Sequence, residues 1–276
     1  MPTALVTGAS RGIGRATVLH LATLGWEVVA AARDVADLES LVAEAPAGRV
    51  TAVALDVTDA AHLAALDGAL PARVDALVNN AGIAIGGPIE ALPLDELRRQ
   101  LEVNVVGQVA VTQALIPRLR TSRGRIVFVS SISGRVSVPM TGAYNASKYA
   151  LEALADALRL ELRTWGIKVS LVEPGAIDTD IWRKVDETVD ATVAALSDEH
   201  RALYARHLEG TRRTTKRVQG QTSPVDKVTA AIEKALTAPR PKARYLVGVD
   251  ARVQAALGAL PTPLADAAFG KATGTP

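Results

Sequence analysis

The chain contains 276 residues, and its 31 lysines and arginines nearly balance its 29 acidic residues, which gives a net charge of +2. This length is sufficient for one large domain with a buried core, and the balanced charge gives no overall field that would attract nucleic acid. Without cysteine, and without a His-x-x-x-His pair among four histidines, the sequence excludes disulfides and thiolate catalysis and gives no reason to expect a metal site.

Short apolar segments alternate with longer segments of helical periodicity along most of the chain. The predicted strands are residues 4–7, 27–32, 50–55, 75–79, 125–130, 167–173 and 243–248. The predicted helices are residues 12–24, 36–45, 60–70, 94–119, 144–164 and 225–237. Repeated strand–helix units of this size predict a single α/β domain, a doubly wound parallel sheet of the Rossmann type with helices on both faces.

The first predicted turn is rich in glycine and joins a strand to a helix. A dinucleotide pyrophosphate can bind at such a turn, because N–H groups and the positive helix end face it and glycine permits close approach. The spacing here is Gly-x-x-x-Gly-x-Gly, which differs from the Gly-x-Gly-x-x-Gly of ordinary dinucleotide-binding folds. The predicted cofactor residues in this turn are Gly8, Ser10, Arg11, Gly12, Ile13 and Gly14.

Tyr144 and Lys148 lie four residues apart, so their side chains occupy one face of the predicted helix 144–164. An ammonium roughly 4 Å from a phenol stabilises phenolate by about 4 kcal/mol at an effective dielectric of ~20. That free energy corresponds to about three pKa units, which would bring a tyrosine near neutral pH. One side of the helix is predicted to be anchored in core or subunit contacts by Leu151, Leu154, Leu158 and Leu162.

Two segments depart from the alternation of strands and helices. Residues 178–223 are long and partly helical, and we expect them to be a substrate lid within a dinucleotide-binding domain over residues 1–250. Residues 251–276 are expected to be a C-terminal extension that covers the domain. The chain starts without a basic leader, and no apolar stretch reaches the ~18–20 residues of a membrane span, so we expect a cytoplasmic protein.

The motifs occur in an order that resembles the short-chain dehydrogenase/reductases over residues 3–250. They are the Gly8/Gly12/Gly14 turn, Asp56-Val57, Asn79-Asn80-Ala81-Gly82, Asn104-Val105-Val106-Gly107, Ser130-Ser131, Tyr144/Lys148 and Pro174-Gly175. The resemblance implies a nicotinamide-dependent oxidoreductase that acts on a small-molecule carbonyl or alcohol. The segment 31–34, the long lid and the C-terminal extension are similar to the 17β-hydroxysteroid dehydrogenase and retinol dehydrogenase branch, which suggests a bulky apolar substrate.

The same resemblance implies where the cofactor lies. It places Asp56 and Val57 near the adenine, and the next motif near the adenosine ribose, through Asn80, Ala81 and Gly82. At the nicotinamide end it places Pro174 and Gly175. It also places Ile177 and Thr179 there, near the carboxamide.

The end of the second strand bears on the choice between NADP(H) and NAD(H). Asp34 stands at about the distance from the glycines at which an acid holds the ribose 2′-hydroxyl of NAD. In the family, however, that acid occupies the last strand residue, here Ala32, and a following arginine such as Arg33 binds the 2′-phosphate of NADP. Arg11 supplies a second cation, so we expect NADP(H). The alternative is that Arg33 is an ordinary exposed loop residue and the cofactor is NAD(H).

Ser131 precedes Tyr144 by thirteen positions, the separation found in the family between the hydroxyl that orients the carbonyl and the acid. The resemblance implies that Tyr144 donates a proton to the oxygen of a carbonyl that receives hydride, while Ser131 holds that oxygen. Lys148 is expected to hydrogen-bond the nicotinamide ribose and to lower the pKa of Tyr144. Asn104 is expected to hold a water that relays protons to Lys148.

Three further expectations concern substrate and partners. An apolar wall of the substrate site is expected from Ile85, Val138, Met140, Ile181 and Trp182. A homodimer or homotetramer is expected through the helices 94–119 and 144–164. The rival interpretation is an NADP-sensing regulator of the same fold without turnover, although such proteins commonly lack the catalytic tyrosine or lysine that this chain retains.

Overall fold

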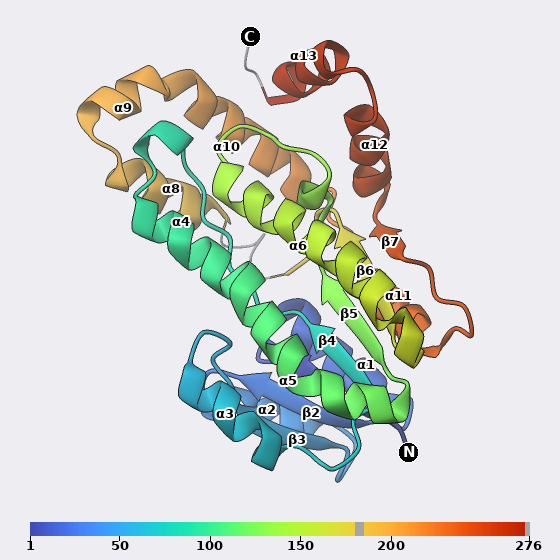
Figure 1. The fold of residues 1–276 in the computed structure, drawn as a ribbon. Helices are drawn as coiled ribbons and strands as arrows, with labels where there is room; N and C mark the ends of the chain where they lie inside the picture. Colours follow the sequence, from blue (N-terminus) through green and yellow to red (C-terminus); the bar gives the residue numbers. More distant parts are fainter. Residues whose placement is uncertain (180–184, 274–276) are drawn as a thin grey trace.

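Seven parallel strands form a sheet in residues 1–179 and 185–273, the part of the chain that the computed structural model describes (Figure 1). The strands are β1 (Thr3–Thr7), β2 (Glu27–Ala32), β3 (Val50–Ala54), β4 (Ala76–Asn79), β5 (Arg125–Val129), β6 (Lys168–Pro174) and β7 (Arg244–Val247). Their order in the sheet is β3-β2-β1-β4-β5-β6-β7. This order confirms the doubly wound sheet and places its topological switch between β1 and β4.

Helices connect the strands and extend the domain beyond the sheet. The α-helices are α1 (Gly12–Thr23), α2 (Glu39–Glu44), α3 (Ala60–Ala69), α4 (Leu94–Leu101), α5 (Gly107–Ser122), α6 (Gly142–Glu161), α8 (Val185–Ala195), α9 (Asp198–Leu203), α10 (Ala205–Gln219), α11 (Asp226–Thr237), α12 (Val249–Gly258) and α13 (Thr262–Thr273). Short 3-10 turns are η1 (Ala36–Leu38), η2 (Ile89–Ala91), η4 (Ile132–Gly134) and η5 (Leu162–Trp165). In the described part of the chain, no helix is long and apolar enough to cross a membrane.

The predicted helix 94–119 changes its hydrogen-bond pattern in the middle. A π-helical segment, η3 (Glu102–Val106), joins α4 to α5, and the helix continues to Ser122. It ends there because Arg123 adopts the left-handed conformation, with a φ of 52°. Single-turn π segments inside α-helices occur frequently at functional sites.

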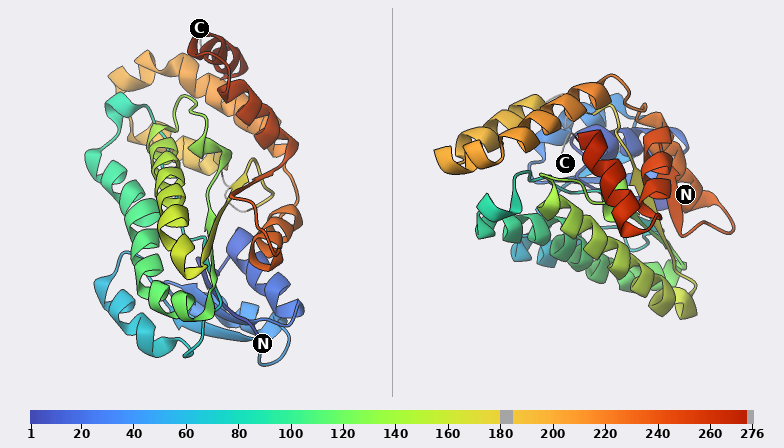
Figure 2. Two further views of the ribbon diagram at one scale, coloured as in Figure 1. Left: turned by 45° about the vertical axis from the view of Figure 1, so that its right-hand side comes forward. Right: turned by 90° about the horizontal axis from the view of Figure 1, so that it is seen from above.

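Alternate residues of each strand pack on opposite faces of the sheet, between the two groups of helices seen in Figure 2. Val28 and Ala30 of β2 face a core that includes α1, α2 and α11. Val29 and Ala31 face a second core that includes α3, α5 and α6. Burial on both faces explains why the strands are continuously apolar rather than alternating.

Helix α6 is held in the second core through most of the predicted leucines. Leu151 of α6 and Leu162, the first residue of η5, are buried, and Leu158 of α6 packs against the same cluster. Leu154 remains exposed, because its position faces away from the sheet. The turn of α6 that carries Tyr144 and Lys148 therefore belongs to a helix anchored along its length.

Helices α8, α9 and α10, between β6 and β7, and helices α12 and α13, after β7, extend beyond the carboxyl edge of the sheet (Figures 1 and 2). Helices α8, α9 and α10 belong to the segment predicted as a lid, and α10 contacts both α8 and α13. Helix α12 contacts β7 and η4, where Ala251 packs with Ile132 and Val136. The C-terminal helices thus contact both the predicted lid and the segment that follows β5.

Candidate active site

The loops that carry the predicted motifs leave the sheet at the same edge. The glycine turn follows β1, residues 80–82 follow β4, residues 130–131 follow β5, and residues 174–179 follow or end β6. All strands are parallel and β1 neighbours β4, so their carboxyl ends bring these segments together. The fold therefore gathers the predicted cofactor and catalytic residues in one region.

The glycine turn has a geometry suited to an anion. Gly8 and Gly12 have φ values of +64° and +55°, the left-handed region that glycine adopts without strain. A Cβ on Gly14 would lie 2.2 Å from the carbonyl oxygen of Gly8. Arg11 precedes α1 without a side-chain cap, and the first turn of α1 carries no acidic residue. The positive end of α1 is therefore available to a phosphate group. Two further predicted residues of this turn are half-buried, Ser10 and Ile13.

Asn80 fastens the glycine turn to the loop after β4. Its Nδ2 donates hydrogen bonds to the carbonyl oxygens of Thr7 and Gly8, each at 3.0 Å. The hydroxyl of Thr7 accepts from the backbone N–H groups of Asn80 and Ala81, again each at 3.0 Å. The Asn80 side chain is thus committed to the turn, while Gly82 lies exposed beside it. Thr7 was not among the predicted site residues, although a hydroxyl at the end of an otherwise apolar strand was a signal for it.

Asp56 and Val57 follow β3 at the same edge of the sheet. The Asp56 carboxylate accepts hydrogen bonds from the backbone N–H and the hydroxyl of Thr58, at 2.9 and 2.7 Å. Val57 is buried under the start of α5, where a Cβ on Gly107 would lie 2.7 Å from Val57 Cγ2. Glycine at 107 is therefore required for α5 to pack on this loop.

Strand β2 ends at Ala32, and both Arg33 and Arg11 are exposed. The Asp34 carboxylate accepts a hydrogen bond from the backbone N–H of Ala36 at 2.9 Å, at the start of η1. Asp34 is therefore engaged in a local turn, although the count from the glycines gave it a place at the ribose.

Ser131, Tyr144 and Lys148 converge beside the end of β5. The Ser131 hydroxyl accepts from the Ser133 backbone N–H at 3.1 Å and is hydrogen-bonded to Tyr144. The Lys148 ammonium donates to the Val129 carbonyl oxygen at 2.9 Å and lies 5.7 Å from the centre of the Tyr144 ring. Ser131 and Lys148 are buried, and Tyr144 is half-buried. The three groups therefore have the proximity that acid–base chemistry at one oxygen requires.

Burial dominates the protonation of this cluster. It raises the pKa of Tyr144 above its ordinary value, and the hydrogen bond with Ser131 opposes that shift. It also lowers the pKa of Lys148 to about 8, against the attraction of the Glu152 carboxylate one turn further along α6. The lowered Tyr144 pKa that we expected from Lys148 is therefore not found in the protein alone, because burial disfavours the phenolate.

Gln100, Asn104 and Gln108 form a buried polar row on α4, η3 and α5. Gln100 accepts from the Ile85 N–H at 2.7 Å and donates to the Ile83 carbonyl oxygen at 2.8 Å. Asn104 accepts from the Ile83 N–H and donates to its carbonyl oxygen, both at 2.9 Å. The row therefore holds the main chain that follows β4.

The same row reaches helix α6, which carries the predicted catalytic residues, and the loop after β4. Asn104 Nδ2 also donates to the Ser147 hydroxyl at 3.1 Å, and Gln108 Nε2 donates to the Ala81 carbonyl oxygen at 2.7 Å. Asn104 and Ala81 of this network were predicted as site residues, and Ile85 was predicted in the substrate wall, whereas Gln100 and Gln108 were not predicted. A signal was present, because amides at a spacing of four residues share one helical face.

The loop after β6 runs from Ser131, the predicted carbonyl-orienting residue, to the glycine turn. The Ser131 hydroxyl donates to the Pro174 carbonyl oxygen at 3.5 Å. Thr179 lies at the other end, where a Cβ on Gly12 would be 3.6 Å from Thr179 Cγ2. Ile177 is buried between them, and its carbonyl oxygen accepts from the Thr179 hydroxyl at 3.3 Å. The predicted nicotinamide-end residues thus border both Ser131 and the glycine turn.

Part of the predicted substrate wall contacts the lid. Met140 has a φ of 70°, and its carbonyl oxygen accepts from the Gly87 N–H at 2.7 Å. Its side chain packs with Leu196 and Leu208 of the predicted lid. Ile85 and Val138 are half-buried, whereas two of the predicted residues lie outside the described part of the chain, Ile181 and Trp182.

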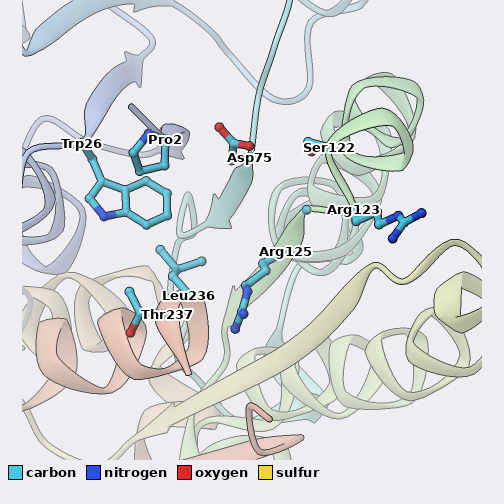
Figure 3. A pocket seen from close by; sticks show the side chains of 9 residues that line it. Pro2, Trp26, Asp75, Ser122, Arg123, Arg125, Leu236 and Thr237 are labelled. Carbon is cyan, nitrogen blue, oxygen red and sulfur yellow. The ribbon is translucent and has the colours of Figure 1, made fainter. Parts of the chain in front are cut away.

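A pocket of about 410 Å³ lies at the opposite, amino edge of the sheet (Figure 3). Pro2 and Asp75 line it together with Arg125. The Arg125 guanidinium donates to the carbonyl oxygens of Ala235 and Ala238 at the end of α11, at 3.0 and 2.6 Å. Its cation is therefore used within the fold, and we assign this pocket no function.

The fold and the site define a dinucleotide-dependent class of protein, and comparison with known sequences identifies the family. Residues 2–190 match the family model described as short chain dehydrogenase. The chain belongs to the short-chain dehydrogenase family, which confirms the resemblance found in the sequence.

Three relatives are reductases or dehydrogenases by name. The chain is 37% identical to 3-amino-tetrahydro-pyrrolizinone reductase of Xenorhabdus hominickii, over 90% of this chain and 87% of the relative. It is 35% identical to retinol dehydrogenase 5 of Mus musculus, over 90% and 81%. It is 34% identical to NADPH-dependent 3-dehydrocapnine reductase of Ornithobacterium rhinotracheale, over 97% and 96%. The relatives include the retinol dehydrogenase branch predicted from the sequence.

A solved structure supports the same assignment. A short-chain dehydrogenase from Burkholderia cenocepacia, crystallised in complex with NADP, superposes with a TM-score of 0.75. It is 26% identical in sequence, and the match covers 97% of each chain.

Proposed function

We propose that this protein is an NADP(H)-dependent oxidoreductase that interconverts a carbonyl and a secondary alcohol on an apolar substrate. The observation that carries the proposal is the convergence of Ser131, Tyr144 and Lys148 at the carboxyl edge of the sheet, next to the loop that reaches the glycine turn. Acid–base groups and a dinucleotide site in one region are what hydride transfer to a carbonyl requires.

The residues present fit a nicotinamide dinucleotide. The uncapped start of α1 suits the pyrophosphate, and the left-handed Gly8 and Gly12 let the chain approach it closely. Asp56 and Val57 would lie at the adenine, and Ile177 and Thr179 at the carboxamide. When bound, the cofactor supplies or accepts the hydride.

The protein's own groups handle the oxygen and its proton. Ser131 holds the substrate oxygen by a hydrogen bond, and Tyr144 donates its phenolic proton to that oxygen as negative charge develops. In the oxidative direction, Tyr144 accepts the proton instead. Lys148 stabilises the phenolate form, and its charge matters more in a site from which substrate has displaced water.

Asn104 can accept a hydrogen bond from the proton-relay water. Its Oδ1 accepts one hydrogen bond, from the Ile83 N–H. A carbonyl oxygen has two acceptor positions, so one remains for a water that passes protons towards Lys148. The Ser147 bond holds Asn104 next to the catalytic helix while it does so.

Tyr144→Phe tests the central role. It should lower kcat by about a hundredfold or more, since a general acid contributes that much, while NADPH binding persists. Tyr149→Phe is the matched control, because Tyr149 is an exposed phenol on the same helix. Turnover of Tyr144→Phe close to that of Tyr149→Phe would contradict the proposal.

Arg33→Ala tests the cofactor. We expect the preference for NADPH over NADH in kcat/KM to fall about tenfold or more, because an arginine–phosphate hydrogen bond is charge-assisted. Arg123→Ala removes an exposed arginine at the far edge of the sheet and should leave the preference intact. If Arg33→Ala leaves this preference unchanged, either the cofactor is NAD(H) or a residue other than Arg33 binds the 2′-phosphate.

The sensor interpretation makes a different prediction, namely NADPH binding without consumption. A screen of apolar aldehydes, ketones and secondary alcohols against both cofactors distinguishes the enzyme from the sensor.

The proposal also includes self-association through the long helices, where Leu154 and Leu160 of α6 are exposed. Light scattering measures the molar mass in solution. The wild type should have the mass of a dimer or tetramer, and Leu160→Glu should have a lower mass.

A further inference from the structure

Asp250 connects the C-terminal helix α12 to the loop that follows β6. Its Oδ2 accepts a hydrogen bond from the backbone N–H of Ala176 at 2.7 Å. Asp250 lies in the first turn of α12, whereas Ala176 lies between the catalytic serine's partner, Pro174, and Ile177. A carboxylate from the C-terminal segment thus contacts the main chain proposed to border the nicotinamide.

Two glycines make room for this carboxylate. A Cβ on Gly175 would lie 2.0 Å from Asp250 Oδ2, and a Cβ on Gly248 would lie 2.3 Å from Asp250 Oδ1. Gly248 also has a φ of +109°, a conformation that residues with side chains rarely adopt. The carboxylate therefore occupies space that is open only because residues 175 and 248 are glycines. This close fit is expected of a specific contact.

The rest of the loop is held by main-chain groups. The Gly175 N–H donates to the Val247 carbonyl oxygen, and the Asp178 N–H donates to the Ser223 carbonyl oxygen, both at 2.9 Å. The Ser223 N–H in turn donates to the Ala176 carbonyl oxygen at 2.9 Å. Among the amides of Gly175, Ala176 and Asp178, that of Ala176 is the one whose partner here is a side chain. A substitution at 250 can therefore release it without altering the backbone pairing.

We propose that Asp250 is a positioning residue that sets the loop 174–179 for the nicotinamide half of the dinucleotide, so that the C-terminal helix tunes cofactor binding from outside the cleft. This inference rests on the proposed dinucleotide-binding function. Asp250 contacts neither the substrate nor the reacting atoms in this scheme; it acts through Ala176.

The test separates the two halves of the cofactor. Dissociation constants are measured for NADPH and for adenosine 2′,5′-bisphosphate, which represents the adenosine half and lacks the nicotinamide. Asp250→Ala should weaken NADPH about tenfold, as expected for loss of a charged hydrogen bond, and change the affinity for the bisphosphate by less than about twofold. Asp250→Asn keeps an acceptor oxygen and should restore most of the NADPH affinity. Asp266→Ala removes an exposed carboxylate from α13 and should change neither constant.

Should Asp250→Ala fail to fold, Gly175→Ala serves in its place, because the added Cβ displaces the carboxylate while Asp250 is retained. The same selective loss of NADPH affinity is expected. Equal weakening of both ligands would assign Asp250 a merely structural role and overturn the inference, as would unchanged NADPH affinity. If the wild type binds NADH instead, NADH and AMP replace the two ligands; if it binds neither dinucleotide, the proposed function itself fails and the inference fails with it.

Discussion

Lys148 shows how strongly burial alters a predicted catalytic group in this protein. Its side chain is 5% exposed, and its ammonium donates to the Val129 carbonyl oxygen. Burial nevertheless lowers its pKa from 10.5 to about 8. The folded protein therefore holds this lysine in a state in which modest changes of charge nearby can alter its protonation, which suits a residue that exchanges protons.

The lowered pKa of Lys148 predicts a pH-dependent stability. Between about pH 8 and 10.5 the unfolded chain binds more protons at this lysine than the folded chain does, so the free energy of unfolding should rise with pH. From pH 8 to 9.5 the wild type should gain about 2 kcal/mol relative to Lys148→Met, measured by urea unfolding. Lys227→Met, at an exposed lysine, should follow the wild type. Parallel curves for the wild type and Lys148→Met would show that Lys148 titrates normally.

At the scale of elements, the helix formed by α4, η3 and α5 organises much of the site. Its buried amides at 100, 104 and 108 hold the loop after β4, and its first α5 residue packs on the loop after β3. Buried polar groups are stabilising only when they are paired, so this row requires that loop to adopt one conformation. The helix therefore positions the predicted adenosine-binding segments as well as Asn104.

Gly107→Ala tests the packing of this helix. The added Cβ would lie 2.7 Å from both the Cγ2 and the carbonyl oxygen of Val57, and the backbone cannot move without disturbing β3. We expect a loss of about 1–3 kcal/mol in the free energy of unfolding, together with weaker NADPH binding. Gly68→Ala is the control on α3, where no atom lies within 4 Å of the added Cβ. That substitution should stabilise the protein by about 0.5–1 kcal/mol, and equal effects of the two would contradict the packing argument.

Across the whole molecule, an ion cluster joins segments that are distant in the sequence. Arg244 of β7 pairs with Glu152 and Asp156 of α6, at 2.9 and 2.7 Å, and with Glu173 of β6 at 3.2 Å. Arg135, which follows η4, pairs with Glu173 at 2.8 Å. Because Glu173 is fully buried, desolvation raises its pKa to about 7, against the two arginines. The cluster ties helix α6 to the strands that lead into the loop 174–179 and the C-terminal helices.

The raised pKa of Glu173 predicts a loss of stability as pH rises. The folded state retains this proton up to about pH 7, whereas the unfolded chain releases it near pH 4.5, so the contribution is present below pH 4.5 and is lost towards pH 7. Relative to Glu173→Gln, the wild type should lose up to about 3 kcal/mol between pH 4.5 and 7. Urea unfolding at several pH values measures it, with Glu199→Gln at an exposed carboxylate as control. If the free energy of unfolding changes equally with pH in the wild type and in Glu173→Gln, the arginines hold Glu173 ionised.

The strands, most helices and the order of motifs could be predicted from the sequence, because apolar periodicity and glycine spacing are local properties. The two ends of β2, and the grouping of the predicted site loops at the carboxyl edge of the sheet, also followed from these patterns. The roles of Thr7, Gln100 and Gln108 could not, since each depends on which loop packs against it.

The sequence by itself determined the doubly wound fold, the family, and the clustering of Ser131, Tyr144 and Lys148, because parallel strands place their carboxyl ends together whatever the details of packing. Only the tertiary structure decided that burial raises the pKa of Tyr144 and lowers that of Lys148, and that Asp250 reaches Ala176 from the C-terminal helix. Desolvation and contacts between distant segments depend on how the whole chain packs, and no local pattern encodes them.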